Sequence, residues 1–300
     1  MRKLADLIFQ RDRLREELSK IEKEISVLTQ KTPSLNLPFA HETLKDRAQE
    51  KPSYSAPLTP QQKISLFFEL FKGRGDVFAE RWESFYDPQK AGYSPICIKR
   101  SSECRRPYSF CKNCPDKRYK PLTTKDIEQH LLGNKTIVSY PLVNGRYCPF
   151  AVIDLDEDDW RSDAKAILEC AEKFNIPAYP EISRSGKGIH VWIFFDGLVS
   201  AKDARLLCDS LITLTQNQIR TEVSLSSFDR IIPCQDVLDT NQLGNLVALP
   251  LQKKRRPYAS VFVDKNLQPL KDQWQLLRTV RKLSAEELSE WLENFGVDES

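Results

Sequence analysis

The sequence has 300 residues, enough for one large domain or two modest ones, and its 40% hydrophobic and 29% charged residues are typical of a globular protein. Lys and Arg number 45 against 42 Asp and Glu, so the net charge is only +3. This balance excludes a globally basic coat for nucleic acid, and any basic surface must come from local clusters. The longest apolar runs fall short of the ~20 residues of a membrane span, and the charged N-terminus is unlike a secretory signal. We therefore expect a cytoplasmic protein with no membrane partner, in which the eight cysteines serve metal binding or burial rather than disulfides.

Residues 1–30 predict one long helix with a heptad seam. Its apolar positions alternate in steps of three and four, with Arg11 in the single missing slot: Leu4, Leu7, Leu14, Leu18, Ile21, Ile25 and Leu28. This pattern favours a coiled coil that self-associates or docks a partner protein, and the alternative is a lone amphipathic helix folded onto the body. Residues 31–58 are rich in proline and lack periodicity, so we expect a linker there.

We place the main domain at residues 59–283 and a C-terminal helix and tail at 284–300. Thr59 followed by Pro60 is typical of a helix start, with threonine as the cap and proline at the first helical position. The segment after Asp272 continues as a helix or an extended tail, and Ser284 with Glu287 predicts a capping box for the last helix.

The middle of the chain alternates between strand and helix patterns. Strand-like runs occupy 150–155, 178–183, 189–195, 246–251 and 260–264, and single apolar helix faces occupy 161–174 and 201–216. The order strand, helix, strand, turn, strand, helix, strand predicts the split βαβ arrangement of ferredoxin-like and RNA-recognition-motif folds. The fold class is therefore α+β.

Four of the eight cysteines fall within eighteen residues, with the spacing C-x6-C-x6-C-x2-C: Cys97, Cys104, Cys111 and Cys114. Four thiolates satisfy a tetrahedral Zn²⁺, and a polar loop with no core of its own would take its folding energy from the metal. The alternative is four unrelated reduced cysteines. The remaining cysteines, at 148, 170, 208 and 234, stand in apolar contexts that favour burial.

The cysteine segment is also basic, because eight Lys and Arg between residues 99 and 120 face only Glu103 and Asp116. Tyr108, Phe110 and Tyr119 are interleaved with the cations. Cations for phosphates and rings for bases are what a single-stranded nucleic-acid surface requires, although a solvated zinc loop has a similar composition. A second basic run, residues 253–256, is expected in a turn.

Asp154 and Asp156 end the apolar run at 150–155. Strand alternation puts both carboxylates on one face, about 7 Å apart along the backbone, where they can hold Mg²⁺ or Mn²⁺. The alternative is an acidic turn that caps the following helix. Asp229 is the third carboxylate that we expect to complete the metal shell, with Asp236 and Glu222 as alternatives.

The segment 184–190, RSGKGIH, follows in a strand–turn–strand context. Its two glycines allow a tight turn with backbone N–H groups open to an anion, and the donors Arg184, Ser185, Lys187 and His190 surround it. We interpret the segment as a triphosphate clamp beside the metal pair. It is not a Walker loop, because the spacing differs and no helix follows directly.

The order Asp-x-Asp, Ser-Gly-Lys-Gly-x-His and a single Asp resembles motifs I, II and III of the archaeo-eukaryotic primase superfamily. The sequence is most similar to the primase-polymerase domain of TOTE conflict systems, which belong to prokaryotic defence, and to CRISPR-associated primase-polymerases. Stretches such as LFKGRGDVFAERW, RSGKGIHVWIFF and FDRIIPCQD carry the resemblance, which covers about residues 62–280 and leaves the N-terminal helix outside.

The resemblance implies a DNA primase-polymerase, a nucleotidyltransferase that joins NTPs or dNTPs on single-stranded DNA with two Mg²⁺ or Mn²⁺ ions. It implies catalytic metal ligation by Asp154, Asp156 and Asp229 and triphosphate contact by Ser185, Lys187 and His190, to which we add Arg184 and Arg230. It also makes the cysteine loop a zinc-binding insertion. Helicase and nuclease motifs are not apparent, so such activity would come from a partner protein.

Two other functions stay open at this stage. A non-catalytic, zinc-containing module that binds single-stranded nucleic acid would need neither Asp154 nor His190. A metal-dependent nuclease would use paired aspartates for hydrolysis instead of synthesis. The Ser-Gly-Lys-Gly-x-His segment favours a triphosphate ligand over both.

Overall fold

The computed structural model describes Lys20 and residues 56–87, 90–101, 104, 111, 114–156, 159–219, 225–239 and 242–296. The chain divides into two compact units, Met1–Ser55 and Ala56–Ser300. Apart from Lys20, the predicted coiled coil lies outside the described residues, and so does nearly all of the predicted linker. Within those residues no helix is long and apolar enough to cross a membrane.

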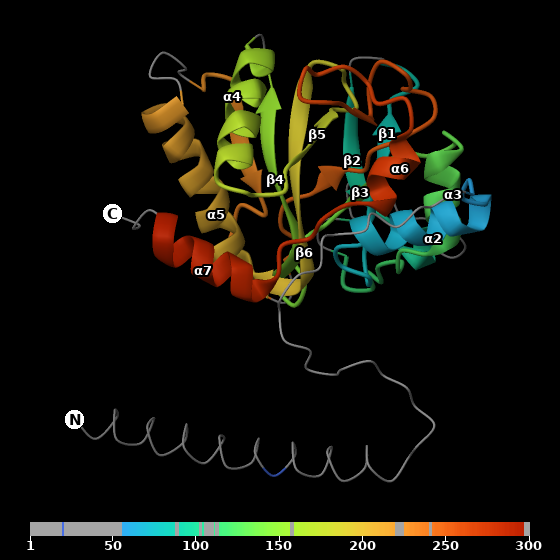
Figure 1. Cartoon of the computed structure of the whole chain (residues 1–300). Coiled ribbons are helices and arrows are strands. Elements are labelled where there is room, and N and C mark those ends of the chain that lie inside the picture. Colours follow the sequence, from blue (N-terminus) through green and yellow to red (C-terminus); the bar gives the residue numbers. More distant parts are fainter. Residues whose placement is uncertain are drawn as a thin grey trace, which may run out of the picture. The chain divides into compact units, whose positions relative to one another are not determined.

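The second unit contains two antiparallel sheets in its described part (Figure 1). The smaller sheet has the order β2-β1-β3-β8, with β1 at Ala79–Glu83, β2 at Ala91–Pro95, β3 at Ile137–Ser139 and β8 at Val247–Ala248. The larger sheet has the order β7-β4-β6-β5-β9, with β4 at Tyr147–Asp156, β5 at Tyr179–Ile182, β6 at Gly188–Ser200, β7 at Phe228–Ile232 and β9 at Val261–Phe262. The helices are α2 at Pro60–Phe71, α3 at Thr124–Leu131, α4 at Trp160–Lys173, α5 at Ala201–Leu214, α6 at Gln273–Arg278 and α7 at Ala285–Phe295.

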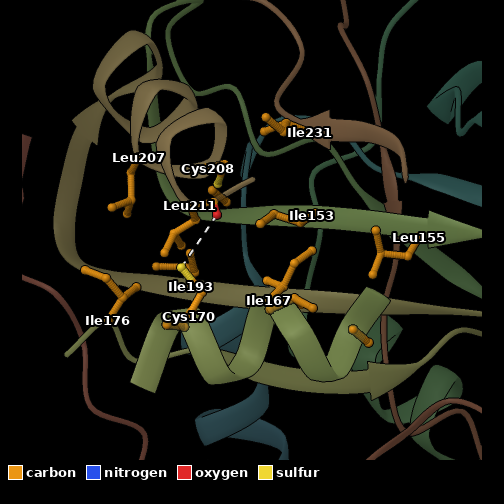
Figure 2. Close-up of a cluster of buried hydrophobic side chains, with 14 of the residues drawn as sticks. Ile153, Leu155, Ile167, Cys170, Ile176, Ile193, Leu207, Cys208, Leu211 and Ile231 are labelled. Carbon is orange, nitrogen blue, oxygen red and sulfur yellow. Dashed lines mark hydrogen bonds between the residues drawn. The ribbon is translucent and has the colours of Figure 1, made fainter. Parts of the chain in front are cut away.

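One face of the larger sheet is covered by α4, α5 and α7 (Figure 1). Alternate residues of β4 and β6, among them Ile153 and Ile193, point into this core and meet apolar side chains of the helices. Figure 2 shows the packing between α4 and α5, where the Cys170 thiol donates to the Leu211 carbonyl at 3.7 Å. Cys148, Cys170 and Cys208 are fully buried, as their apolar contexts predict, whereas Cys234 is only half-buried.

The opposite face packs against α2, α3, α6 and strands of the smaller sheet. Here the alternate positions of β4 and β6 carry large apolar side chains, including Phe150, Val152 and Trp192. The series on β4 continues with Asp154 and Asp156 on the same face, because side chains two residues apart on a strand share a side. The acidic pair therefore lies where an apolar sheet face becomes polar.

The core order β4-α4-β5-β6-α5-β7 confirms the predicted split βαβ arrangement. The prediction was wrong about the fourth strand. The run at 246–251 contributes β8 to the smaller sheet, where it pairs with β3, and β7 takes the place beside β4. A short apolar run can enter any sheet, so its partner is decided by long-range hydrogen bonding and not by its own pattern.

The predicted helix ends are confirmed where capping chemistry marks them. Thr59 caps α2 in a capping box with Gln62, and Pro60 is the first helical residue. Ser284 and Glu287 form the capping box of α7. Leu288 and Trp291 of α7 are buried in the same core as the large sheet, so this helix packs with the domain and is not a separate tail.

Candidate active site

A row of polar residues runs across four adjacent strands of the larger sheet. Arg230 on β7 is opposite Asp154 on β4, Asp154 is opposite His190 on β6, and His190 is opposite Glu181 on β5. Directly opposed residues of antiparallel strands point to the same face. The ladder thus brings to one place side chains that are remote in sequence.

Asp229 joins this row through a β-bulge. Asp154 pairs with Arg230 and Leu155 pairs with Phe228, so Asp229 is the extra residue between them. A bulge redirects a side chain that regular alternation would send to the other face. One carboxylate oxygen from each of Asp154, Asp156 and Asp229 lies within 4.8 Å of the others.

The three carboxylates suit a divalent cation. Oδ1 of Asp154 is buried and has no hydrogen-bond partner, although a buried carboxylate oxygen is costly to leave unpaired. Burial first, and then the charges of Asp156 and Asp229, raise the pKa of Asp154 to about 6, against the opposing influence of His190 and Arg230. All-oxygen donor sets of this kind are preferred by Mg²⁺ and Mn²⁺, so the residues fit such a metal.

His190 lies between two carboxylates. Its Nδ1 is 2.7 Å from Oε2 of Glu181, and its Nε2 is 3.5 Å from Oδ1 of Asp154. Burial lowers the pKa of this imidazole, but the charge and hydrogen bond of Glu181 and the charge of Asp154 outweigh burial and raise it to about 9. The ring is therefore a charged donor at neutral pH.

Gly188 is required by the approach of β6 to Asp156. It is directly opposite Asp156, and a Cβ at this position would be 2.0 Å from Asp156 Oδ1 and 2.4 Å from the Leu155 carbonyl. Any larger residue would push the Asp156 carboxylate, a candidate metal ligand, aside. Gly188, the second glycine of the RSGKG segment, thus leaves the space that the Asp156 carboxylate occupies.

The turn before Gly188 uses its own donors internally. The Gly186 N–H donates to the Ser183 carbonyl at 2.9 Å, and the Lys187 N–H donates to Ser185 Oγ at 3.1 Å. Gly186 has a φ of +79°, which favours glycine. Two N–H groups of the predicted anion nest are thus engaged within the turn. The side chains of Ser185 and Lys187 are exposed, and that of Arg184 is half-buried.

The sequence matches the model of the TOTE conflict system archaeo-eukaryotic primase domain over residues 62–291. The chain belongs to this family. Membership supports nucleotidyl transfer on DNA as its general activity.

Solved structures that match this chain include two polymerase domains. The polymerase domain of Mycobacterium tuberculosis ligase D in complex with DNA is 14% identical, with a TM-score of 0.38, and the match covers 78% of this chain and 87% of that one. The domain of the cyanophage S-2L primase-polymerase is 15% identical, with a TM-score of 0.33 and coverage of 73% and 97%. No curated protein matched the sequence.

Of the alternative third ligands in this primase domain, Asp236 is committed elsewhere. It accepts a hydrogen bond from Arg205 at 2.6 Å and is not part of the carboxylate group. Glu222 lies outside the described residues. Asp229 is itself paired with its neighbour Arg230 at 2.6 Å, so the guanidinium balances its charge.

The cysteine loop is only partly described. Cys97, Cys104, Cys111 and Cys114 are half-buried and are not joined in disulfides, and Cys97 forms a β-bridge with Tyr119. Residues 102–103, 105–110 and 112–113, which include Tyr108 and Phe110, lie outside the described part. The zinc site therefore stays a prediction.

Sequence reasoning missed Glu181, which is nevertheless part of the row. It stands in the strand-like run AYPEIS, and its side chain is only 1% exposed. A charged residue within an apolar strand pattern, on the strand that precedes the histidine motif, was the available signal. Only the register of β5 and β6 identifies its partner.

Proposed function

We propose that this primase domain synthesises or extends primers on single-stranded DNA by joining nucleoside triphosphates. The convergence of Asp154, Asp156, Asp229 and His190 on one sheet face carries the proposal. Acidic oxygens for divalent cations, next to a charged imidazole donor, are what transfer of a nucleotidyl group requires.

In the proposed reaction, the 3′-hydroxyl oxygen of a primer or first nucleotide attacks the α-phosphorus of an incoming triphosphate. The bond from this phosphorus to the α–β bridging oxygen breaks, pyrophosphate leaves, and the hydroxyl proton passes to solvent. Two Mg²⁺ or Mn²⁺ ions held by the three aspartates would supply Lewis-acid activation of the hydroxyl and neutralise phosphate charge.

The remaining site residues would act directly on the phosphates. The Nε2–H of His190 donates to a phosphate oxygen and opposes the charge that builds on the leaving pyrophosphate. Arg184, Ser185 and Lys187 extend from the adjacent turn and contact the triphosphate. Arg230 exchanges its bond to Asp229 for a nucleotide phosphate when cations neutralise that carboxylate.

A second cationic surface near the turn is suited to a DNA strand. The run Lys253, Lys254, Arg255 and Arg256 has no acidic partner among the described residues, and Tyr258 beside it is 84% exposed. Ala259 lies against Gly186 of the triphosphate turn, where a Cβ on the glycine would be 3.6 Å from the alanine Cβ. Unpaired cations with an exposed ring fit a single strand, whose phosphates and bases they would contact.

We further propose that the four clustered cysteines bind one structural Zn²⁺, which orders the basic loop for contact with the strand. Four thiols are a complete tetrahedral donor set. Measuring the zinc content of the purified wild type and of Cys111→Ser/Cys114→Ser tests this. We expect about one ion per chain and its loss in the variant, and zinc-free wild type would refute it.

The test of the main proposal is template-directed synthesis with labelled NTP or dNTP, with and without a primer, in Mg²⁺ and in Mn²⁺. Wild type should incorporate nucleotides, and Asp154→Ala/Asp156→Ala should lose incorporation by about 10³-fold or more, since metal coordination supplies several kcal/mol. Equal activity of the two proteins would end the proposal. Tight strand binding without synthesis would instead support a non-catalytic module, and degradation of the primer would support a nuclease.

A further inference from the structure

Glu181 is a buried carboxylate that the proposed chemistry does not use. Its Oε2 accepts from the His190 ring at Nδ1, 2.7 Å away, and from the Trp192 indole Nε1–H at 3.3 Å. A buried carboxylate is expensive unless it is paired, and here both partners lie on the neighbouring strand β6. Neither partner is a metal ligand candidate.

The bond sets the orientation of the imidazole. Glu181 and His190 are directly opposite in the β5–β6 ladder, so the contact is built into the strand register. With Nδ1 turned to Glu181, the other nitrogen, Nε2, faces Asp154 at 3.5 Å. A 180° flip of the ring would put the carbon Cδ2 in place of Nδ1 and Cε1 in place of Nε2, which would break the bond to Glu181.

The carboxylate is itself held in place by the core. Trp192, its second donor, is fully buried and packs edge-on against Phe71 at 5.1 Å and stacks with Phe194 at 5.9 Å. The indole therefore has a single position, and Oε2 of Glu181 is fixed between two donors on β6. An apolar residue at 181 would fill the space but leave Nδ1 of His190 buried with no acceptor.

We propose that Glu181 is a positioning residue that holds the His190 ring with Nε2 toward Asp154 and the phosphates of the nucleotide. The proposal rests on the proposed function in that it takes a nucleoside triphosphate as the ligand of His190. Outer partners that orient a metal-ligating imidazole are typically worth about 10–100-fold in metal affinity or activity, and we expect an effect of that order for this phosphate-facing ring.

The experiment is a double-mutant cycle with Glu181→Gln and His190→Ala, read as kcat/KM for the nucleotide and as Kd for the primed template. Glutamine keeps the volume of the side chain, so the fold should survive. We expect Glu181→Gln alone to lower kcat/KM by about 10–100-fold without changing the Kd for DNA. In the His190→Ala background the same substitution should change kcat/KM by less than about twofold, because the ring it positions is gone.

Asp126→Asn is the matched control. Asp126 is also a buried carboxylate, paired with Lys120 and Thr123 in the region of α3. The substitution removes the same charge from the interior but changes no residue of the polar row across the larger sheet. The kcat/KM for the nucleotide should therefore stay at the wild-type value.

A readout independent of activity is the side-chain NMR signal of the His190 Nδ1 proton, identified by its loss in His190→Ala. It should be shifted downfield in the wild type and move upfield in Glu181→Gln. Equal losses of kcat/KM in both backgrounds, or wild-type kcat/KM in Glu181→Gln, would overturn the positioning role. Failure of the proposed function itself is distinguishable, because wild type would then show no synthesis while the NMR comparison stays interpretable.

Discussion

Two buried histidines in this domain have pKa values that are shifted in opposite directions. His130 on α3 accepts from the Ile137 N–H at 3.1 Å and lies 2.8 Å from the Pro250 carbonyl, and burial lowers its pKa to about 4. His190 on β6 is also buried, yet its pKa rises to about 9, because two carboxylates face it and outweigh burial.

The two histidines differ in their partners: His130 contacts backbone groups, whereas His190 contacts side-chain carboxylates. His130 satisfies a backbone donor and a backbone acceptor, so it stays neutral and joins α3, β3 and the segment after β8. His190 contacts carboxylates on two neighbouring strands, and in the proposed function its Nε2–H would donate to a phosphate. Burial of a histidine therefore does not by itself indicate a functional site. The groups that face the ring decide whether its pKa rises or falls.

The largest expected effect comes from removing each ring in turn. His190→Asn should lower kcat/KM for nucleotide incorporation by about 100-fold, as for loss of one charge-stabilising donor. His130→Phe should leave kcat/KM of the folded enzyme unchanged but destabilise the fold by about 2–4 kcal/mol, because it leaves two buried backbone groups unpaired. Primer extension and urea unfolding measure the two effects, and similar losses of kcat/KM in both variants would break the comparison.

The pH dependence of stability gives a second test of the difference between the two histidines. The folded pKa of His130 is about 4 against an ordinary value of 6.5, so the unfolded chain binds more protons between these values. Its contribution is present above about pH 6.5 and is lost as pH falls toward 4. The gap in unfolding free energy between wild type and His130→Phe should shrink by about 2 kcal/mol between pH 7 and pH 5. A constant gap across urea melts at several pH values would contradict this assignment.

A smaller effect is expected at the close approach of β6 to the acidic cluster. Gly188→Ala would place a methyl group 2.0 Å from Asp156 Oδ1, so the carboxylate or the strand must move. We expect a loss of about tenfold in kcat/KM and about 1–3 kcal/mol in stability. Gly75→Ala is the control for the loss of a glycine, because nothing lies within 4 Å of an added Cβ there and its φ, like that of Gly188, is outside the left-handed region. Wild-type synthesis by Gly188→Ala would show that the approach is not needed.

The smallest effect is expected at Asp236, which sequence alone kept as an alternative metal ligand. Its partner is Arg205, at a half-buried surface position. Asp236→Asn should change stability by at most about 1 kcal/mol and leave incorporation at the wild-type level. A fall comparable to that of Asp229→Asn, measured side by side, would reopen the choice of the third ligand.

Local sequence patterns were sufficient wherever the information was itself local. Thr59, Pro60, Ser284 and Glu287 predict the ends of their helices, because a cap depends on residues three positions apart. Alternation along β4 places Asp154 and Asp156 on one face for the same reason. The family motifs also name His190 and Asp229 as members of one site.

Tertiary structure alone decided which strands meet and in what register. The identity of β7 as the neighbour of β4, the bulge that turns Asp229 toward Asp154, and the pairing of Glu181 with His190 all depend on hydrogen bonds between distant segments. A shift of one residue in either ladder would send these side chains to the opposite face, yet would leave every local pattern unchanged. Periodicity thus indicated β4, β5, β6 and the helices α4 and α5, whereas the raised pKa of His190 came from the strands that the fold placed beside it.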